Sequence, residues 1–262
     1  MSIYFMITLF ILGFIGSFLS GMLGVGGAIV NYPLLLYIPS MIGLTALSSH
    51  EVSGIVAAQV FFATLSGVLA YRKGGYLNKG LILYMGISSL AGSLIGGFGS
   101  RWVSGDAVNL VYGVLALLAV VLMFIPRRAP ENSEGGAPLQ YNRLLAVVLS
   151  FSVGICAGIV GAGGAFLLVP IMLVILKIPV RVTVATSLAV TFISSIGSIT
   201  GKLMTQQVLY LPALIIVIAS IIASPLGAKL GQKLNARVLK VILFILILAA
   251  TIKIWIGLFM TH

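Results

Sequence analysis

The sequence contains very little charge. Only 7% of its 262 residues are Asp, Glu, Lys or Arg, and only four are acidic. Soluble domains carry about 25% charged residues, so this composition excludes an ordinary water-facing domain. Instead, 60% of the residues are hydrophobic and the mean hydropathy is +1.23. These values predict a membrane protein with several spans.

Side chains for catalysis and metal binding are scarce too. Cys156 is the single cysteine, which excludes an intramolecular disulfide and a thiolate cluster. Apart from the neighbouring pair His50 and Glu51, the acids lie in loops or the polar linker and the second histidine is terminal. No nucleophile with its base and no metal-ligand spacing can be found. We therefore expect neither an enzyme nor a bound cofactor or metal.

Apolar runs of about 20 residues, long enough to cross a bilayer as helices, recur along the chain. They cover Ile3–Leu19, Val52–Tyr71, Leu81–Ser100, Ala107–Ile125, Thr183–Lys202, Leu209–Ala228 and Val241–Phe259. Alternating strand patterns are absent. The first run lacks a preceding basic segment and a cleavage-like site, so we interpret it as a span. The prediction is an all-α integral membrane protein.

One unusual phrase occurs twice. GMLGVGGAIVNYP begins at Gly21 and GIVGAGGAFLLVP begins at Gly158, an offset of 137 residues. A weaker match pairs AGSLIGGFGS at 91–100 with IASPLGAKLG at 222–231. Between the copies lies a polar stretch rich in Pro and Gly. This internal repeat predicts a first membrane repeat at 1–125, a cytoplasmic linker at 126–139 and a second repeat at 140–262.

The number of crossings in each half decides how the halves are oriented. Ile3–Ile38 and Leu144–Leu176 are each too long for one span. If each crosses once, the halves are parallel and the basic residues divide evenly between the two faces. If each turns back at its glycines, the halves are inverted and the basic residues divide twelve to three. One face then holds Arg72, Lys73, Lys79, Arg127, Arg128, Arg143, Lys177, Arg181, Lys229, Lys233, Arg237 and Lys240, and the other Arg101, Lys202 and Lys253.

The second arrangement obeys the positive-inside rule. We therefore predict inverted repeats of four to five segments each in the plasma membrane, with both termini on the non-cytoplasmic side. The segments after the glycines are short, and the sequence leaves open whether they span fully or are re-entrant.

The repeated glycines predict broken helices at the repeat interface. Such breaks leave backbone N–H groups free, and the positive end of a restarting helix favours an anion. Two copies would form one composite site. Its expected members are Gly24, Gly26, Gly27, Ala28, Gly161, Gly163, Gly164 and Ala165. The alternative is that these glycines only allow close helix packing. On the first interpretation, Gly163→Val abolishes transport while the protein still folds.

Four polar side chains in apolar segments are further candidate ligands: Asn31, Gln59, Thr186 and Ser187. The counterpart of Asn31 is Leu168, so the site is expected to be asymmetric. The alternatives are hydrogen bonds between helices for the amides and bonds to the same helix for the hydroxyls.

Four other positions are ionisable and lie near helix ends. His50 and Glu51 could carry a coupling proton, and the alternative is a pair that anchors the helix end. Lys202 and Arg72 would suit anion attraction, although we expect both to reach the headgroups.

The two glycine phrases, VATSLAVTFISSIGS (184–198) and SSHEVSGIVAAQVFFATLSGVLAYRKGGY (48–76) resemble the TauE/SafE sulfite exporter family. The resemblance covers nearly the whole chain except the linker. It implies a permease that exports a small sulfur-containing anion such as sulfite, sulfoacetate or another organosulfonate by alternating access. The partners are then this anion and the lipid bilayer; no nucleic acid is expected, and a homo-oligomer is compatible with the sequence. An anion channel and a transporter of another small organic anion are the alternatives.

Overall fold

The computed structural model describes residues 2–72, 75–125 and 141–260, and these residues form helices without any strand. The predicted linker at 126–139 lies outside them. The helices are α1 (Ile3–Leu23), α2 (Ala28–Met41), α3 (Ser49–Tyr71), α4 (Lys79–Gly99), α5 (Gly105–Phe124), α6 (Arg143–Val160), α7 (Ala165–Pro170), α8 (Val180–Met204), α9 (Tyr210–Lys233) and α10 (Ala236–Met260). A 3-10 turn, η2 (Ser100–Trp102), follows α4, and a π-helical turn, η3 (Ile171–Ile175), continues α7.

Eight of the described helices are long and apolar enough to cross a membrane. The exceptions are α2 and the segment formed by α7 and η3, which are the short segments expected after the two glycine phrases. The prediction of an all-α membrane protein is therefore confirmed. Several long helices begin where a Ser or Asn side chain accepts a hydrogen bond from a backbone N–H of the first turn. These caps are Ser2, Ser48, Asn78, Ser104 and Asn142.

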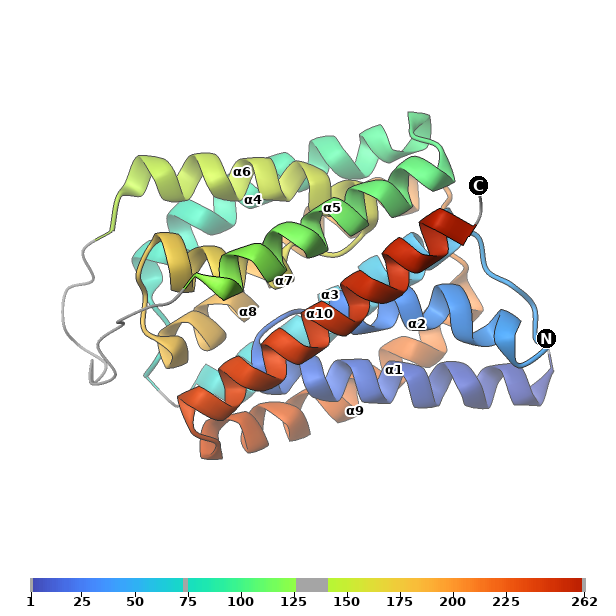
Figure 1. Cartoon of the computed structure of the whole chain (residues 1–262), viewed down its shortest axis with the longest axis horizontal. Coiled ribbons are helices and arrows are strands. Elements are labelled where there is room, and N and C mark those ends of the chain that lie inside the picture. Colours follow the sequence, from blue (N-terminus) through green and yellow to red (C-terminus); the bar gives the residue numbers. More distant parts are fainter. Residues whose placement is uncertain (1, 73–74, 126–140, 261–262) are drawn as a thin grey trace.

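The chain starts and ends at the same end of the molecule. In Figure 1 the start of α1 and the end of α10 lie at the right, while α5 and α9 end, and α6 and α10 begin, at the left. Helix α2 begins part-way along the molecule and returns toward the end where α1 started (Figure 1). Each half thus contains one short segment that follows a helix break.

The two halves pack against each other through equivalent helices. Helix α1 packs mainly on α9, and α4 packs mainly on α6 and α8. Bare glycines allow the close approach: a Cβ at Gly21 would collide with the carbonyl of Ser224, and a Cβ at Gly158 with that of Ser93. Because Gly21 and Gly158 are repeat partners, as are Ser93 and Ser224, each half gives the other the same contact. The orientation of the halves across the bilayer stays a prediction.

Candidate functional site

Both glycine phrases interrupt a helix, as the repeat predicted. Gly24 ends α1 and Gly161 ends α6 in the left-handed conformation, and Gly27 and Gly164 precede α2 and α7 in the same region. The φ angles of these residues lie between +75° and +83°. L-amino acids with side chains rarely adopt this region, so glycine is required for the backbone path itself.

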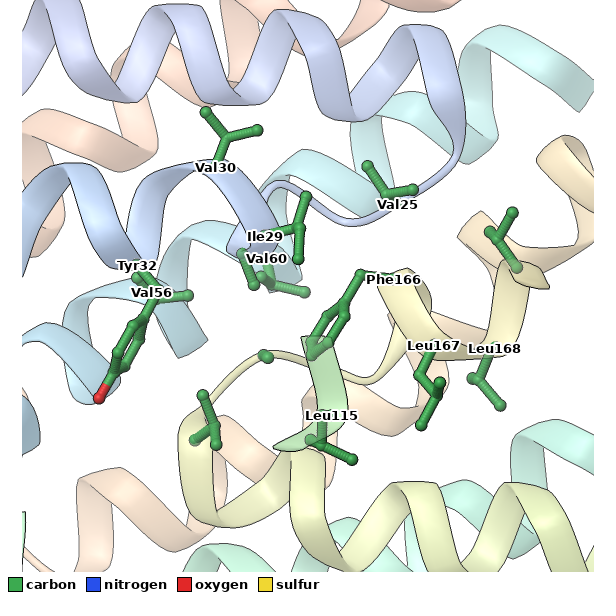
Figure 2. Close-up of a cluster of buried hydrophobic side chains, with 14 of the residues drawn as sticks. Val25, Ile29, Val30, Tyr32, Val56, Val60, Leu115, Phe166, Leu167 and Leu168 are labelled. Carbon is green, nitrogen blue, oxygen red and sulfur yellow. The ribbon is translucent and has the colours of Figure 1, made fainter. Parts of the chain in front are cut away.

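The two turns meet in the interior of the molecule. A Cβ at Gly26 would lie 3.3 Å from Cβ of Ala165 and 3.1 Å from Cγ2 of Thr191. Figure 2 shows that apolar side chains, including Val60 and Phe166, fill the space between the two turns. A Cβ at Gly163 would lie only 2.8 Å from Val60 Cγ1 and from Thr191 Cγ2. These contacts argue against the expectation that Gly163→Val still folds, because valine lacks room there and the φ of +62° at Gly163 would strain it.

The turns leave backbone donors without acceptors. In the described part of the chain, the N–H groups of Gly26, Gly27 and Ala28 form no hydrogen bond. The first backbone bonds of α2 run from Val30 and Asn31 to the carbonyl of Gly27, at 3.2 and 3.0 Å. Buried backbone N–H groups are rarely unpaired in folded proteins. The start of α2 therefore offers donors and a positive dipole end.

Five fully buried polar side chains surround the turn before α2. We call this set the polar cluster: Ser17, Ser20, Asn31, Gln59 and Ser220. Gln59 Nε2 donates to Ser17 Oγ at 2.8 Å, and the hydroxyls of Ser17 and Ser220 lie 2.7 Å apart. A Cβ at Gly27 would lie 3.0 Å from Gln59 Nε2 and 3.4 Å from Ser20 Cβ. The polar cluster therefore adjoins the helix break directly.

Four atoms of the polar cluster have no hydrogen-bond partner among the described residues. They are the Oγ of Ser20, both side-chain polar atoms of Asn31, and Oε1 of Gln59. Leaving a buried polar group unsatisfied costs about 1–3 kcal/mol, so groups of such atoms are uncommon in folded proteins. Asn31 lies against Gly16, whose missing side chain makes room for the amide. A polar solute or water is the natural partner for this group of atoms.

Among the residues that the structure describes, the equivalent position before α7, Gly164, has apolar neighbours instead. The side of Gly164 that would carry a Cβ faces Cγ1 of Val153 at 3.0 Å, Cβ of Ala157 at 3.2 Å and Cδ1 of Leu168 at 3.7 Å. At the offset of 137, these residues replace Gly16, Ser20 and Asn31 of the first half. The two halves thus share the backbone path of the turn, but the side chains around it are polar in the first half and apolar in the second. The asymmetry expected from Leu168 extends to the surroundings of the whole turn.

The two candidate hydroxyls on α8 already have partners. Ser187 Oγ donates to the carbonyl of Gly24 at 2.8 Å and so holds the first turn against α8. Thr186 Oγ1 accepts from the backbone N–H of Asn78 at 3.1 Å and contacts Tyr76 O at 3.4 Å, both in the connection from α3 to α4. Neither hydroxyl belongs to the polar cluster.

Of the four ionisable candidates, only Lys202 differs from its predicted surroundings. Glu51 accepts from the N–H and the hydroxyl of Ser48 at 2.7 and 2.9 Å, which is a capping box at the start of α3. His50 Nδ1 lies 3.3 Å from Oε1 of Gln207. Arg72 is exposed, as expected. Lys202 does not reach the surface: it is fully buried, so the expectation that it extends to the headgroups is wrong.

A hydrogen bond from α5 stabilises the start of α2. Pro33 lies inside α2 and has no N–H to offer the carbonyl of Ile29, four residues earlier. The hydroxyl of Tyr112 donates to that carbonyl at 2.7 Å. The ring of Tyr112 also stacks on Tyr32, whose hydroxyl donates to Asn109. The proline thus frees an acceptor that a neighbouring helix uses.

Sequence reasoning missed Ser17, Ser20 and Ser220 in the polar cluster. A signal for two of them was present, because Ser17 and Ser20 are spaced to share one face of α1, where the repeat has only Gly154 and Ala157. Ser220 comes from α9, and only tertiary packing brings it into the cluster.

Comparison with known proteins agrees with this architecture. The chain is 28% identical over 228 residues to the probable membrane transporter protein YunE of Bacillus subtilis, covering 80% of this chain and 83% of the relative. It is 28% identical over 196 residues to a probable membrane transporter protein of Methanocaldococcus jannaschii, covering 74% and 71%. No solved structure matches the chain significantly. Residues 9–254 match the family model described as sulfite exporter TauE/SafE. The chain therefore belongs to the TauE/SafE sulfite exporter family of membrane transporters.

Proposed function

We propose that this transporter moves a small sulfur-containing anion, such as sulfite, sulfoacetate or another organosulfonate, out of the cell by alternating access. The observation that carries the proposal is the group of unpartnered atoms in the polar cluster beside the first helix break. The family name supports the substrate class. Sulfonate and sulfite oxygens accept hydrogen bonds, and the start of α2 supplies donors together with a favourable dipole.

The polar cluster also limits which anions fit. Its unpartnered atoms include donors on Ser20 and Asn31, and acceptors on Asn31 and Gln59. An anion that carries a donor of its own satisfies both kinds of atom. Hydrogen sulfite has an acidic O–H, and some organosulfonates carry a hydroxyl or amino group. We therefore expect these to bind better than sulfate, which offers acceptors only.

Access would switch through the contact between the two glycine turns. In the described conformation the turns touch, and Val60 and Thr191 pack beside both of them. A solute in the polar cluster can pass to the other side only when this packing opens. Movement of one half against the other, as in other transporters with repeated broken helices, provides that opening.

The proposal is tested with purified protein in liposomes. Uptake of radiolabelled sulfite, sulfoacetate and taurine is measured against sulfate and a carboxylate analogue, with and without unlabelled solute inside. We expect saturable uptake of a sulfur anion that accelerates when the same anion is present on the far side. A rate that rises linearly with concentration, without this acceleration, would instead identify a channel. Saturable transport of the carboxylate alone would refute the sulfur specificity.

A further inference from the structure

Lys202 is a buried cation that the proposed function does not use. It lies in the last turn of α8 and has an exposure of 0%. Its Nζ donates to the backbone carbonyl of Ile159 at 2.8 Å and to Oε1 of Gln207 at 2.8 Å. Both partners in the described part of the chain are uncharged. A buried ammonium without a carboxylate is costly, and ionisable groups within membrane spans are often functional.

The fold does not require an ammonium at this position. The carbonyl of Ile159 also accepts from Ser53 Oγ at 3.2 Å, so it keeps a donor if Lys202 is removed. Repeat symmetry gives a second argument. Gly24 packs on the carbonyl of Val184 and Gly161 on that of Ser53, so α3 and α8 correspond with an offset of 131. At this offset Tyr71 replaces Lys202, and the other half is built without a cation there.

The side-chain oxygen of Gln207 is where donors converge. Besides the ammonium of Lys202 at 2.8 Å, the ring Nδ1 of His50 lies 3.3 Å from it, and Ser100 Oγ lies 3.4 Å away. The amide group of Gln207 in turn donates to Ser100 Oγ at 3.1 Å. The hydroxyl of Ser100 donates its single hydrogen to the carbonyl of Gly97 at 2.7 Å. The donors that face the Gln207 oxygen are therefore the ammonium of Lys202 and, in the tautomer protonated at Nδ1, the ring of His50. Donors of this kind are what proteins offer to an anion.

The side chain of Gln207 lies where it could move away from the ammonium of Lys202. It belongs to the connection between α8 and α9, directly after Gln206, whose φ of +56° is unusual for a residue with a side chain. Gln207 and His50 are half-buried, whereas Lys202 and Ser100 are buried. The amide of Gln207 therefore lies between the ammonium and the surface at this end of the molecule.

We propose that the oxygen of Gln207 occupies the position of an anion oxygen, and that a small oxyanion displaces it to bind Lys202, with His50 as a further donor. The site extends the proposed function, on which it rests for the identity of the anion. Because α8 ends near the chain termini, the site belongs to the predicted non-cytoplasmic side. There it would receive the anion as it leaves the polar cluster.

The test uses sodium sulfite and three variants: Gln207→Ala, Lys202→Met and the control Arg101→Gln, which removes an exposed cation from the neighbouring turn η2. The sulfite concentration for half-maximal thermal stabilisation is measured at constant ionic strength. Gln207→Ala removes the competing oxygen, so we expect this concentration to fall about tenfold, the equivalent of one hydrogen bond to a charged group. For Lys202→Met it should rise at least about tenfold for the same reason, and the control should match the wild type.

If Lys202 and Gln207 had only a structural role, the sulfite midpoint would not fall in one variant and rise in the other. If both variants melt at lower temperature and keep the wild-type sulfite midpoint, the proposal is overturned. If Lys202→Met does not fold, Gln207→Ala decides alone, and an unchanged or higher midpoint refutes the site.

Repeating the titration in an Asn31→Leu background separates this proposal from the previous one. Sulfite binding that survives Asn31→Leu but depends on Lys202 supports the second site and argues against the polar cluster. If Asn31→Leu abolishes sulfite binding, and Lys202→Met leaves the midpoint unchanged in the wild-type background, the polar cluster is supported and the second site is overturned.

Discussion

Replacing Asn31 with leucine should stabilise the protein and stop transport. Both polar atoms of the Asn31 side chain are buried without a partner. Leucine has nearly the same branched outline, so its contact with Gly16 is retained, and the repeat already has Leu168 at the equivalent position. The substitution removes unsatisfied atoms without changing the packing greatly. Transport should fail because the solute loses both a donor and an acceptor.

The size of the stabilisation follows from the cost of one unsatisfied buried amide. That cost is about 1–3 kcal/mol. For a chain of this size, each kcal/mol shifts the melting temperature by about 2–4 °C. We therefore expect the melting temperature of Asn31→Leu, without ligand, to rise by roughly 2–12 °C. Most substitutions in a protein interior destabilise, so a rise of this kind is informative.

The assay combines thermal unfolding in detergent with sulfur-anion uptake in liposomes, normalised to folded protein. Ser150→Ala is the matched control, because Ser150 Oγ is also buried and unpartnered but lies on α6, which packs mainly on α4. Both variants should gain stability, and only Asn31→Leu should lose uptake. If Asn31→Leu transports normally, or melts several degrees lower, the unpartnered amide is not a solute ligand.

Three other predictions concern the turns, the caps and the topology. Gly163→Ala should destabilise far more than Gly43→Ala, since both have positive φ but only Gly163 lacks space for a Cβ; equal losses in melting temperature would show that φ alone matters. Glu51→Ala should cost about 0.5–2 kcal/mol through loss of the capping box, while uptake keeps its wild-type pH dependence; a changed pH profile would restore Glu51 as a proton-coupling residue. In a Cys156→Ser background, a cysteine at exposed Trp102 should react with an impermeant thiol reagent from outside, and one at exposed Leu144 only after permeabilisation; the reverse pattern would refute the predicted orientation.

The sequence was sufficient to predict the breaks because they depend on local chemistry. A Gly-Gly pair does not end a helix by itself, since Gly96-Gly97 lies inside α4. The whole glycine phrase around Gly26-Gly27, with its second copy around Gly163-Gly164, indicates the breaks. The short length of the following segments and the asymmetry at Leu168 could be predicted for the same reason. Each of these conclusions needs only the sequence and its internal repeat, and none needs to know which segments pack together.

Contacts between distant segments could not be predicted in this way. Lys202 lies near a helix end, where a lysine ordinarily reaches water, but the end of α6 and the connection after α8 cover it. The sequence predicts that the hydroxyl of Ser187 is available to a ligand, but the fold brings α8 against the first turn, where this hydroxyl donates to the carbonyl of Gly24. The glycine phrases alone do not identify the first-half counterparts of Thr186 and Ser187, because the offset changes from 137 at the turns to 131 along α3 and α8.

The pairing of α1 with α9 has a consequence for how the protein is made. Helix α1 leaves the ribosome before the other described helices, yet its main partner, α9, follows seven of them in the chain. Until α9 arrives, Gly21 and the neighbouring small residues of α1 face lipid or the insertion machinery instead of the backbone of Ser224. We therefore expect the nascent first half to remain loosely assembled in the membrane, and biogenesis to depend on factors that retain the early helices until α9 has been synthesised.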